Sequence, residues 1–119
     1  MFDVINERLS KFSSELRYED IPQEVLDHLK RVLLDCYGCG LFGSTTPWMR
    51  IYRDTLERMS DRKEASIWGT DRKTSVVNAM MLNGSAINSF ELDDTHTDGI
   101  IPVSPGVLGC ITAFAAMQG

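Results

Sequence analysis

Apolar residues recur at intervals of three and four along most of this 119-residue chain. That spacing places them on one face of an α-helix, whereas a half-buried strand would alternate every second residue. The first such stripe consists of Phe2, Ile5, Leu9, Phe12 and Leu16. We therefore predict an amphipathic helix from about residue 3 to residue 17. Because the pattern returns downstream, we predict an all-α, helical-bundle-like fold.

Prolines mark the starts of three further helices. Pro22, Pro47 and Pro105 each precede an apolar-periodic segment, and proline suits the first helical turn because its missing N–H has no partner there. Thr46 and Ser104 come directly before two of them and carry the hydroxyl that is typical of an N-cap. We expect the helix after Thr46 to end at about residue 60.

The segment between residues 61 and 75 interrupts the helical pattern. A short β-like piece at 65–70 is followed by a charged turn, so we predict at most one short β-hairpin, near 65–73. Thr74 or Ser75 then caps another helix, whose apolar face includes Asn83. A buried asparagine must find hydrogen-bond partners for its amide.

Cys36 and Cys39 form a C-x-x-C pair, a spacing that occurs in redox and zinc sites. Both lie on the apolar stripe of the helix after Pro22, and no second Cys or His pair follows at zinc spacing. We interpret them as buried packing residues. Three glycines follow closely, in GCGLFG, and we expect them to permit close contact between helices and a left-handed cap.

The last predicted helix, GVLGCITAFAAM at 106–117, is apolar nearly all the way round. Such a helix needs cover on every side, and the rest of the chain offers few partners. We infer that the chain is the N-terminal piece of something larger, or that a second subunit covers this helix.

Charge and composition exclude several classes of protein. Seventeen acids against twelve bases give a net charge of −5, which disfavours binding to nucleic acid. The N-terminus carries acids and is no signal peptide, and no apolar run reaches the roughly 18 residues of a membrane span. We expect a cytoplasmic protein with no nucleic-acid or membrane partner.

Chemically active side chains concentrate between residues 83 and 105, where Glu91, Asp93, Asp94, His96 and Asp98 fall within eight residues. Three interpretations remain open: a metal site, although the spacing matches neither an EF-hand nor HExxH; a solvated acidic loop; or an active-site loop. In an active-site loop, the pKa values of neighbouring carboxylates can be pushed apart, and a nearby histidine can exchange protons near neutral pH. Asp93 and Asp94 would point in different directions, so at most one of them would enter a site.

The ordered series Asn83-Gly84-Ser85 and Leu92-Asp93-Asp94-Thr95-His96, followed by a proline turn and a small-residue helix, resembles the MmgE/PrpD family. That family includes 2-methylcitrate dehydratase and cis-aconitate decarboxylase. The resemblance implies a large all-α domain, a smaller α/β domain, an active site between them and a dimer. Residues 1–119 would then be the N-terminal segment of the single all-α domain, truncated relative to the family.

The resemblance implies a lyase that acts on a small polycarboxylate, without metal or organic cofactor. It removes a proton next to a carboxylate, and water or carbon dioxide is then lost, which requires a base and hydrogen-bond donors for the growing charge. The family motif assigns catalytic roles to Glu91, Thr95 and His96. It assigns substrate-binding or loop-ordering roles to Asp93, Asp94 and Asn88. Alone, the 119-residue chain would be inactive, because the later histidines and lysine of the family site are missing.

Three positions depart from the family pattern. Asn88 stands where a histidine is expected, Glu91 where an aspartate is expected, and Ile101 where the histidine of a His-Pro pair is expected. Isoleucine can neither move a proton nor donate a hydrogen bond. Two alternatives therefore remain beside the lyase: a family member with epimerase or isomerase chemistry, and a non-catalytic helical assembly module.

Overall fold

The computed structural model describes residues 2–118 and is mainly α-helical, as predicted. The helices are α1 (Phe2–Glu15), α2 (Gln23–Gly43), α3 (Pro47–Glu57), α4 (Val76–Asn88) and α5 (Ser104–Gln118), with a short 3-10 helix at Tyr18–Asp20. Two antiparallel strand pairs accompany them. Strand β1 (Ala65–Ser66) pairs with β2 (Lys73–Thr74), and β3 (Thr95–His96) pairs with β4 (Ile101–Pro102).

The predicted helix boundaries differ from the observed ones by a few residues. Helix α1 ends at Glu15 rather than at residue 17, and α3 ends at Glu57 rather than near residue 60. Thr46 is the N-cap of α3, but its hydroxyl donates to the Gly43 carbonyl at 2.7 Å and does not cap that helix. The prediction of a capping hydroxyl at Thr46 was therefore wrong, whereas Ser75 does cap α4 by accepting a hydrogen bond from the Asn78 N–H.

The chain divides into two compact units, one ending at Arg31 and the other beginning at Val32. The first contains α1, the 3-10 helix and the start of α2. On α1, the apolar residues Ile5, Leu9 and Phe12 are exposed, and Leu9 and Phe12 are both more than half accessible. The second unit contains the buried core and the whole acidic stretch, so the remaining description concerns that unit.

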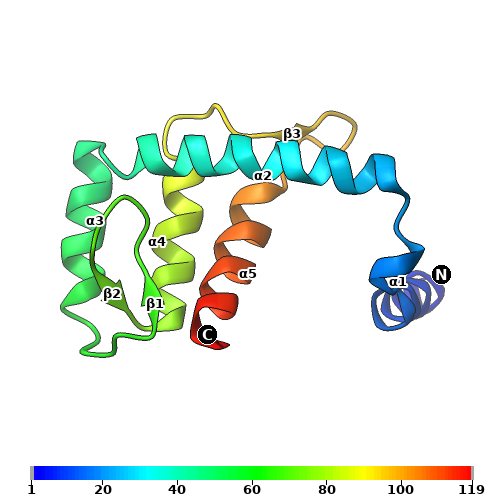
Figure 1. Ribbon diagram of the computed structural model, residues 1–119, viewed down its shortest axis with the longest axis horizontal. Helices are drawn as coiled ribbons and strands as arrows, with labels where there is room; N and C mark the ends of the chain where they lie inside the picture. Colours follow the sequence, from blue (N-terminus) through cyan, green and yellow to red (C-terminus); the bar gives the residue numbers. More distant parts are fainter. Residues whose placement is uncertain (1, 119) are drawn as a thin grey trace. The chain divides into compact units, whose positions relative to one another are not determined.

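Helix α4 is the centre of the second unit and runs beside α5 (Figure 1). Its buried side chains contribute to three apolar clusters. Leu82 and Ala86 meet α3 and Ile67, Ala79 packs with Ala65 and Ala113, and Ile87 packs with both cysteines of α2. A helix buried on this many sides needs few charges, and α4 carries none.

Glycines set the spacing between the helices. An added Cβ at Gly43 would lie 1.9 Å from the Ala86 carbonyl oxygen, and one at Gly109 would lie 2.8 Å from the Gly84 backbone. Close contact between helices is therefore confirmed. The expected left-handed cap is not found, because Gly43 stays helical and Gly69, in the β1–β2 turn, is the one glycine of residues 2–118 with positive φ.

Helix α5 is only half covered. It buries Ser104, Pro105, Gly109 and Ala113 against α4 and β1, while apolar residues on its other side are exposed. The shortage of partners predicted for this helix is thus observed. Within residues 2–118, none of the helices combines the length and hydropathy that a bilayer span requires.

Candidate functional site

The acidic loop, defined as residues 89–103, joins α4 to α5 and contains most of the predicted site residues. Its far end folds back as the β3–β4 pair, in which Thr95 opposes Pro102 and His96 opposes Ile101. This strand pair was not predicted, because two-residue strands are too short to show an alternating pattern. The pairing places Ile101, where the resemblance led us to expect a histidine, directly opposite His96.

Asn88 and Asp93 form the best-defined contact of the site. Asn88 is the last residue of α4, and its side-chain Nδ2 donates to both carboxylate oxygens of Asp93, at 3.0 and 3.2 Å. Both residues are partly buried. The Asn88 amide thereby anchors the loop to the end of α4.

Helix α2 contacts the loop at three successive points. Phe42 packs edge-on against Phe90, with ring centroids 4.6 Å apart. The Cys39 thiol donates to the Leu92 carbonyl at 3.7 Å, and the Cys36 thiol donates to Asp94 Oδ1 at 3.9 Å. In Figure 1 the loop runs beside the part of α2 that belongs to the second unit. Asp93 and Asp94 therefore face different partners, as predicted for sequence neighbours.

Burial raises the pKa of the Cys36 thiol, and although a hydrogen bond from Ser104 opposes this, the nearby Asp94 carboxylate raises the pKa further. Burial also raises the pKa of Cys39, with added repulsion from Asp35 and Asp93. Both thiols therefore remain protonated at neutral pH, and each keeps an S–H group that can act as a weak hydrogen-bond donor. The predicted burial of both cysteines is confirmed.

The three residues predicted to be catalytic lie exposed on the acidic loop. Glu91 has a φ of 60°, a left-handed conformation that is uncommon for a residue with a side chain. His96 Nδ1 accepts a hydrogen bond from the Gly99 N–H at 3.0 Å, so the neutral ring carries its proton on Nε2. Within the described part of the chain, the side chains of Glu91, Thr95 and His96 make no hydrogen bond to one another.

Sequence reasoning missed the part that α2 plays at this loop. The C-x-x-C spacing was the available signal, but it was interpreted as packing alone. An open hollow of about 610 Å³ lies between α2 and the loop. It is lined by Leu34, Asp35, Gly38, Cys39, Phe42, Phe90 and Leu92. Among residues 4–118, no three Cys, His, Asp or Glu side chains lie close enough together to hold a metal ion.

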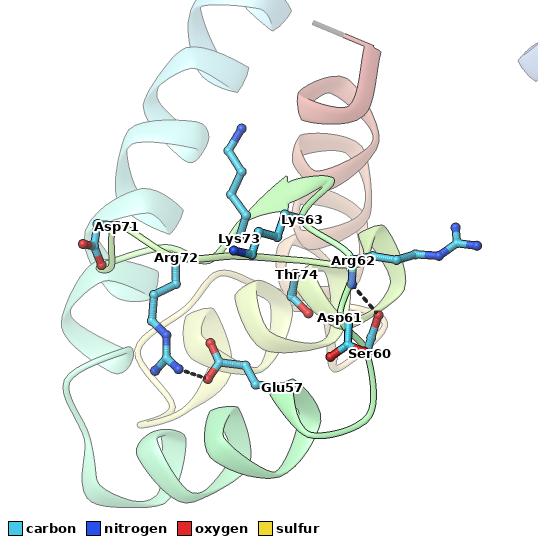
Figure 2. Close-up of a pocket in the computed structure, with 9 residues that line it drawn as sticks. All are labelled: Glu57, Ser60, Asp61, Arg62, Lys63, Asp71, Arg72, Lys73 and Thr74. Carbon is cyan, nitrogen blue, oxygen red and sulfur yellow. Dashed lines mark hydrogen bonds and ion pairs between the residues drawn. The ribbon is translucent and has the colours of Figure 1, made fainter.

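A second hollow, of about 680 Å³, lies beside the β1–β2 pair and is shown in Figure 2. Its lining mixes four basic with three acidic side chains, and Arg72 is already paired with Glu57. It lies near the first turn of α4, whereas the acidic loop follows the last turn. Thirteen helical residues span about 20 Å, so this hollow is separate from the predicted site.

Comparison with known proteins gives a consistent result. The family model described as MmgE/PrpD N-terminal domain matches residues 7–119. The cis-aconitate decarboxylase-like protein oryM of Aspergillus oryzae is 32% identical over 96% of this chain and 24% of its own length. Cis-aconitate decarboxylase of Aspergillus terreus is 28% identical over 96% of the chain and 23% of its own length. The human cis-aconitate decarboxylase is 30% identical over 97% of the chain and 24% of its own length. The chain thus spans about a quarter of the length of these relatives.

Proposed function

Because this chain belongs to the MmgE/PrpD family, we propose that it forms the N-terminal part of a lyase that acts on a small polycarboxylate. The observation that carries the proposal is the similarity to proteins named cis-aconitate decarboxylase over 96–97% of the chain, which includes the acidic loop. In the proposed reaction a proton moves at a carbon beside a carboxylate, and carbon dioxide or water leaves. We further propose a cytoplasmic, dimeric protein.

The contacts of the loop support a division of roles among its acids. Asp93 is held by Asn88 and Asp94 accepts from Cys36, so both order the loop. Among the residues that the structure describes, Glu91 and Thr95 have no such partners. Both are exposed, which leaves a carboxylate to move a proton and a hydroxyl to donate to a substrate oxygen. Since Nδ1 of His96 accepts from the Gly99 N–H, the Nε2–H group of the neutral ring is the one that could donate to a substrate oxygen.

Electrostatics support the proposal that the 119-residue chain is inactive alone. A polycarboxylate beside Glu91, Asp93, Asp94 and Asp98 meets like charge, and repulsion between charges of the same sign disfavours binding. An active site of this kind needs cations or hydrogen-bond donors to hold the developing negative charge. We propose that the remaining three quarters of a full-length protein supply them.

Ile101 favours one alternative. It sits opposite His96 in the β3–β4 register, so this strand pair carries one imidazole rather than two. A family member with epimerase or isomerase chemistry would still move an α-proton, but it would not need the second histidine to complete the loss of water or carbon dioxide.

The test compares the 119-residue chain with the protein encoded by the complete gene. Each is incubated with cis-aconitate, 2-methylcitrate and other small polycarboxylates, and release of carbon dioxide, loss of water and change of configuration are followed by NMR. We expect activity only in the full-length protein. In that protein, Glu91→Gln and Thr95→Ala should each lower kcat/KM by about 100-fold or more, whereas Asp98→Asn should have little effect.

The outcomes separate the three functions. Turnover by the 119-residue chain would contradict the claim that essential groups lie elsewhere. Inversion of configuration without loss of water or carbon dioxide would favour the epimerase. A full-length protein that leaves the whole panel unchanged would favour the non-catalytic module.

A further inference from the structure

The contacts between α2 and the acidic loop follow a regular antiparallel register. Loop positions 90, 92 and 94 meet helix positions 42, 39 and 36, so each step of two residues along the loop matches three residues back along α2. Steps of three keep the helix positions on one face. The loop is thereby fastened over more than one turn of the helix by an aromatic pair and two thiols.

The two thiols differ from ordinary packing residues in what they touch. Cys36 is fully buried and Cys39 is 9% exposed, yet each directs its Sγ at an oxygen atom of the loop. Cys36 also lies beside Ser104, the first residue of α5, which is itself buried. The thiol of Cys36 therefore sits where α2, the acidic loop and the start of α5 meet.

We propose that Cys36 and Cys39 are positioning residues, whose S–H groups hold the acidic loop on α2 and so fix the backbone from which Glu91 and Thr95 project. The effect of this attachment on catalysis rests on the proposed lyase function, whereas the attachment of the loop to α2 is independent of that function. Residue 91 lies between the Phe90 and Leu92 contacts, and Thr95 directly follows Asp94, so Glu91 and Thr95 are each adjacent to an anchored residue.

The competing explanation is that the cysteines only fill space. Valine and serine separate the two explanations, because valine fills the volume without donating a hydrogen bond, while serine donates a hydrogen bond from a smaller side chain. If packing alone matters, valine is the better replacement; if the donor matters, serine is.

Hydrogen exchange at pH 7, followed by mass spectrometry of the full-length protein without substrate, tests this. With Cys36→Val or Cys39→Val we expect exchange in the segment 91–96 to accelerate about two- to fivefold, the effect of losing one weak hydrogen bond. Exchange in α4 should stay unchanged. Cys36→Ser and Cys39→Ser should keep the loop near its wild-type rate, and the exposed Cys110→Val is the matched control.

The proposal would be overturned if the segment 91–96 exchanged at the wild-type rate in the valine variants. It would also be overturned if that segment exchanged as fast in the serine variants as in the valine variants. If a valine variant fails to fold, the serine variants decide alone: protection retained supports a donor role, and protection lost rejects it. If the full-length protein is a lyase, Cys36→Val should lower kcat severalfold, whereas Cys36→Ser should keep kcat near the wild-type value. Absence of any lyase activity would refute the proposed function and leave the exchange result intact.

Discussion

Asn83 shows how one polar residue can hold a small apolar core in register. It is 1% exposed in the middle of α4. Its Oδ1 accepts from the Trp68 N–H at 3.0 Å, and its Nδ2 donates to the Ser66 carbonyl at 3.1 Å. One side chain thereby satisfies two backbone groups of the β1–β2 segment, which has too few strands to satisfy them itself.

We expect Asn83→Ala to lower the free energy of unfolding by about 2 kcal/mol or more, because it leaves a backbone N–H and a carbonyl without partners in a partly buried place. Denaturant titration followed by circular dichroism measures the change. Asn6→Ala, which removes the same amide from an exposed position on α1, should change stability by less than about 0.5 kcal/mol. Equal effects of the two substitutions would show that the two hydrogen bonds contribute little.

The sequence predicted that Asn83 needs partners but not which ones. Its place in an apolar stripe follows from spacing alone. The partners lie 15 and 17 residues earlier, in an irregular segment whose path depends on the packing of α3 and α4. For the same reason Cys36 was correctly predicted to be buried, while its contact with Asp94, 58 residues away, was not predicted.

At the scale of whole elements, helix spacing depends on where a side chain is absent. Gly38 and Gly43 lie on the same helix, α2, in the same sequence motif. A Cβ at Gly38 would meet no atom of the described residues within 4 Å, whereas one at Gly43 would overlap the Ala86 carbonyl oxygen and approach Ser89 Oγ at 2.8 Å. The two glycines therefore have different roles, which sequence alone did not distinguish.

Gly43→Ala and Gly38→Ala should act in opposite directions. We expect Gly43→Ala to destabilise the protein by about 2–3 kcal/mol or more, because backbone atoms of α2 and α4 must separate. Gly38→Ala should stabilise it by about 0.5–1 kcal/mol, since alanine favours the helix and its methyl group meets no obstacle. Thermal and denaturant unfolding of both variants provide the measurement. A Gly43→Ala protein as stable as wild type would mean that the two helices are not in close contact.

The helices were easier to predict from the sequence than the conformation of the acidic loop. The 3.6-residue periodicity and the three prolines located the helices to within a few residues, because helix formation is local. The conformation of the acidic loop depends instead on contacts with α2. It also includes two residues with positive φ, Glu91 and Ile100. Neither glutamate nor isoleucine favours a positive φ, so the local sequence did not predict this backbone conformation.

At the scale of the whole molecule, the apolar surface of the second unit is unevenly covered. Residues Val107, Ile111, Phe114 and Met117 of α5 are each about half exposed. Their spacings of four, three and three residues form one stripe along the helix. Contiguous exposed apolar surface of this kind is uncommon on a protein that is complete by itself, and it agrees with a chain that spans about a quarter of its relatives' length.

The α5 stripe should bind an apolar fluorescent dye such as anilinonaphthalene sulfonate when the 119-residue chain is studied alone. We expect Phe114→Lys and Ile111→Lys each to reduce dye fluorescence by a measurable fraction, because each replaces exposed apolar area with a charge. Circular dichroism should stay near wild type, since neither side chain belongs to the buried clusters. Gln118→Lys adds the same charge to the same helix without removing apolar area, and it should leave the fluorescence unchanged. A decrease with Gln118→Lys equal to that with Phe114→Lys would mean that charge, rather than the stripe, controls dye binding.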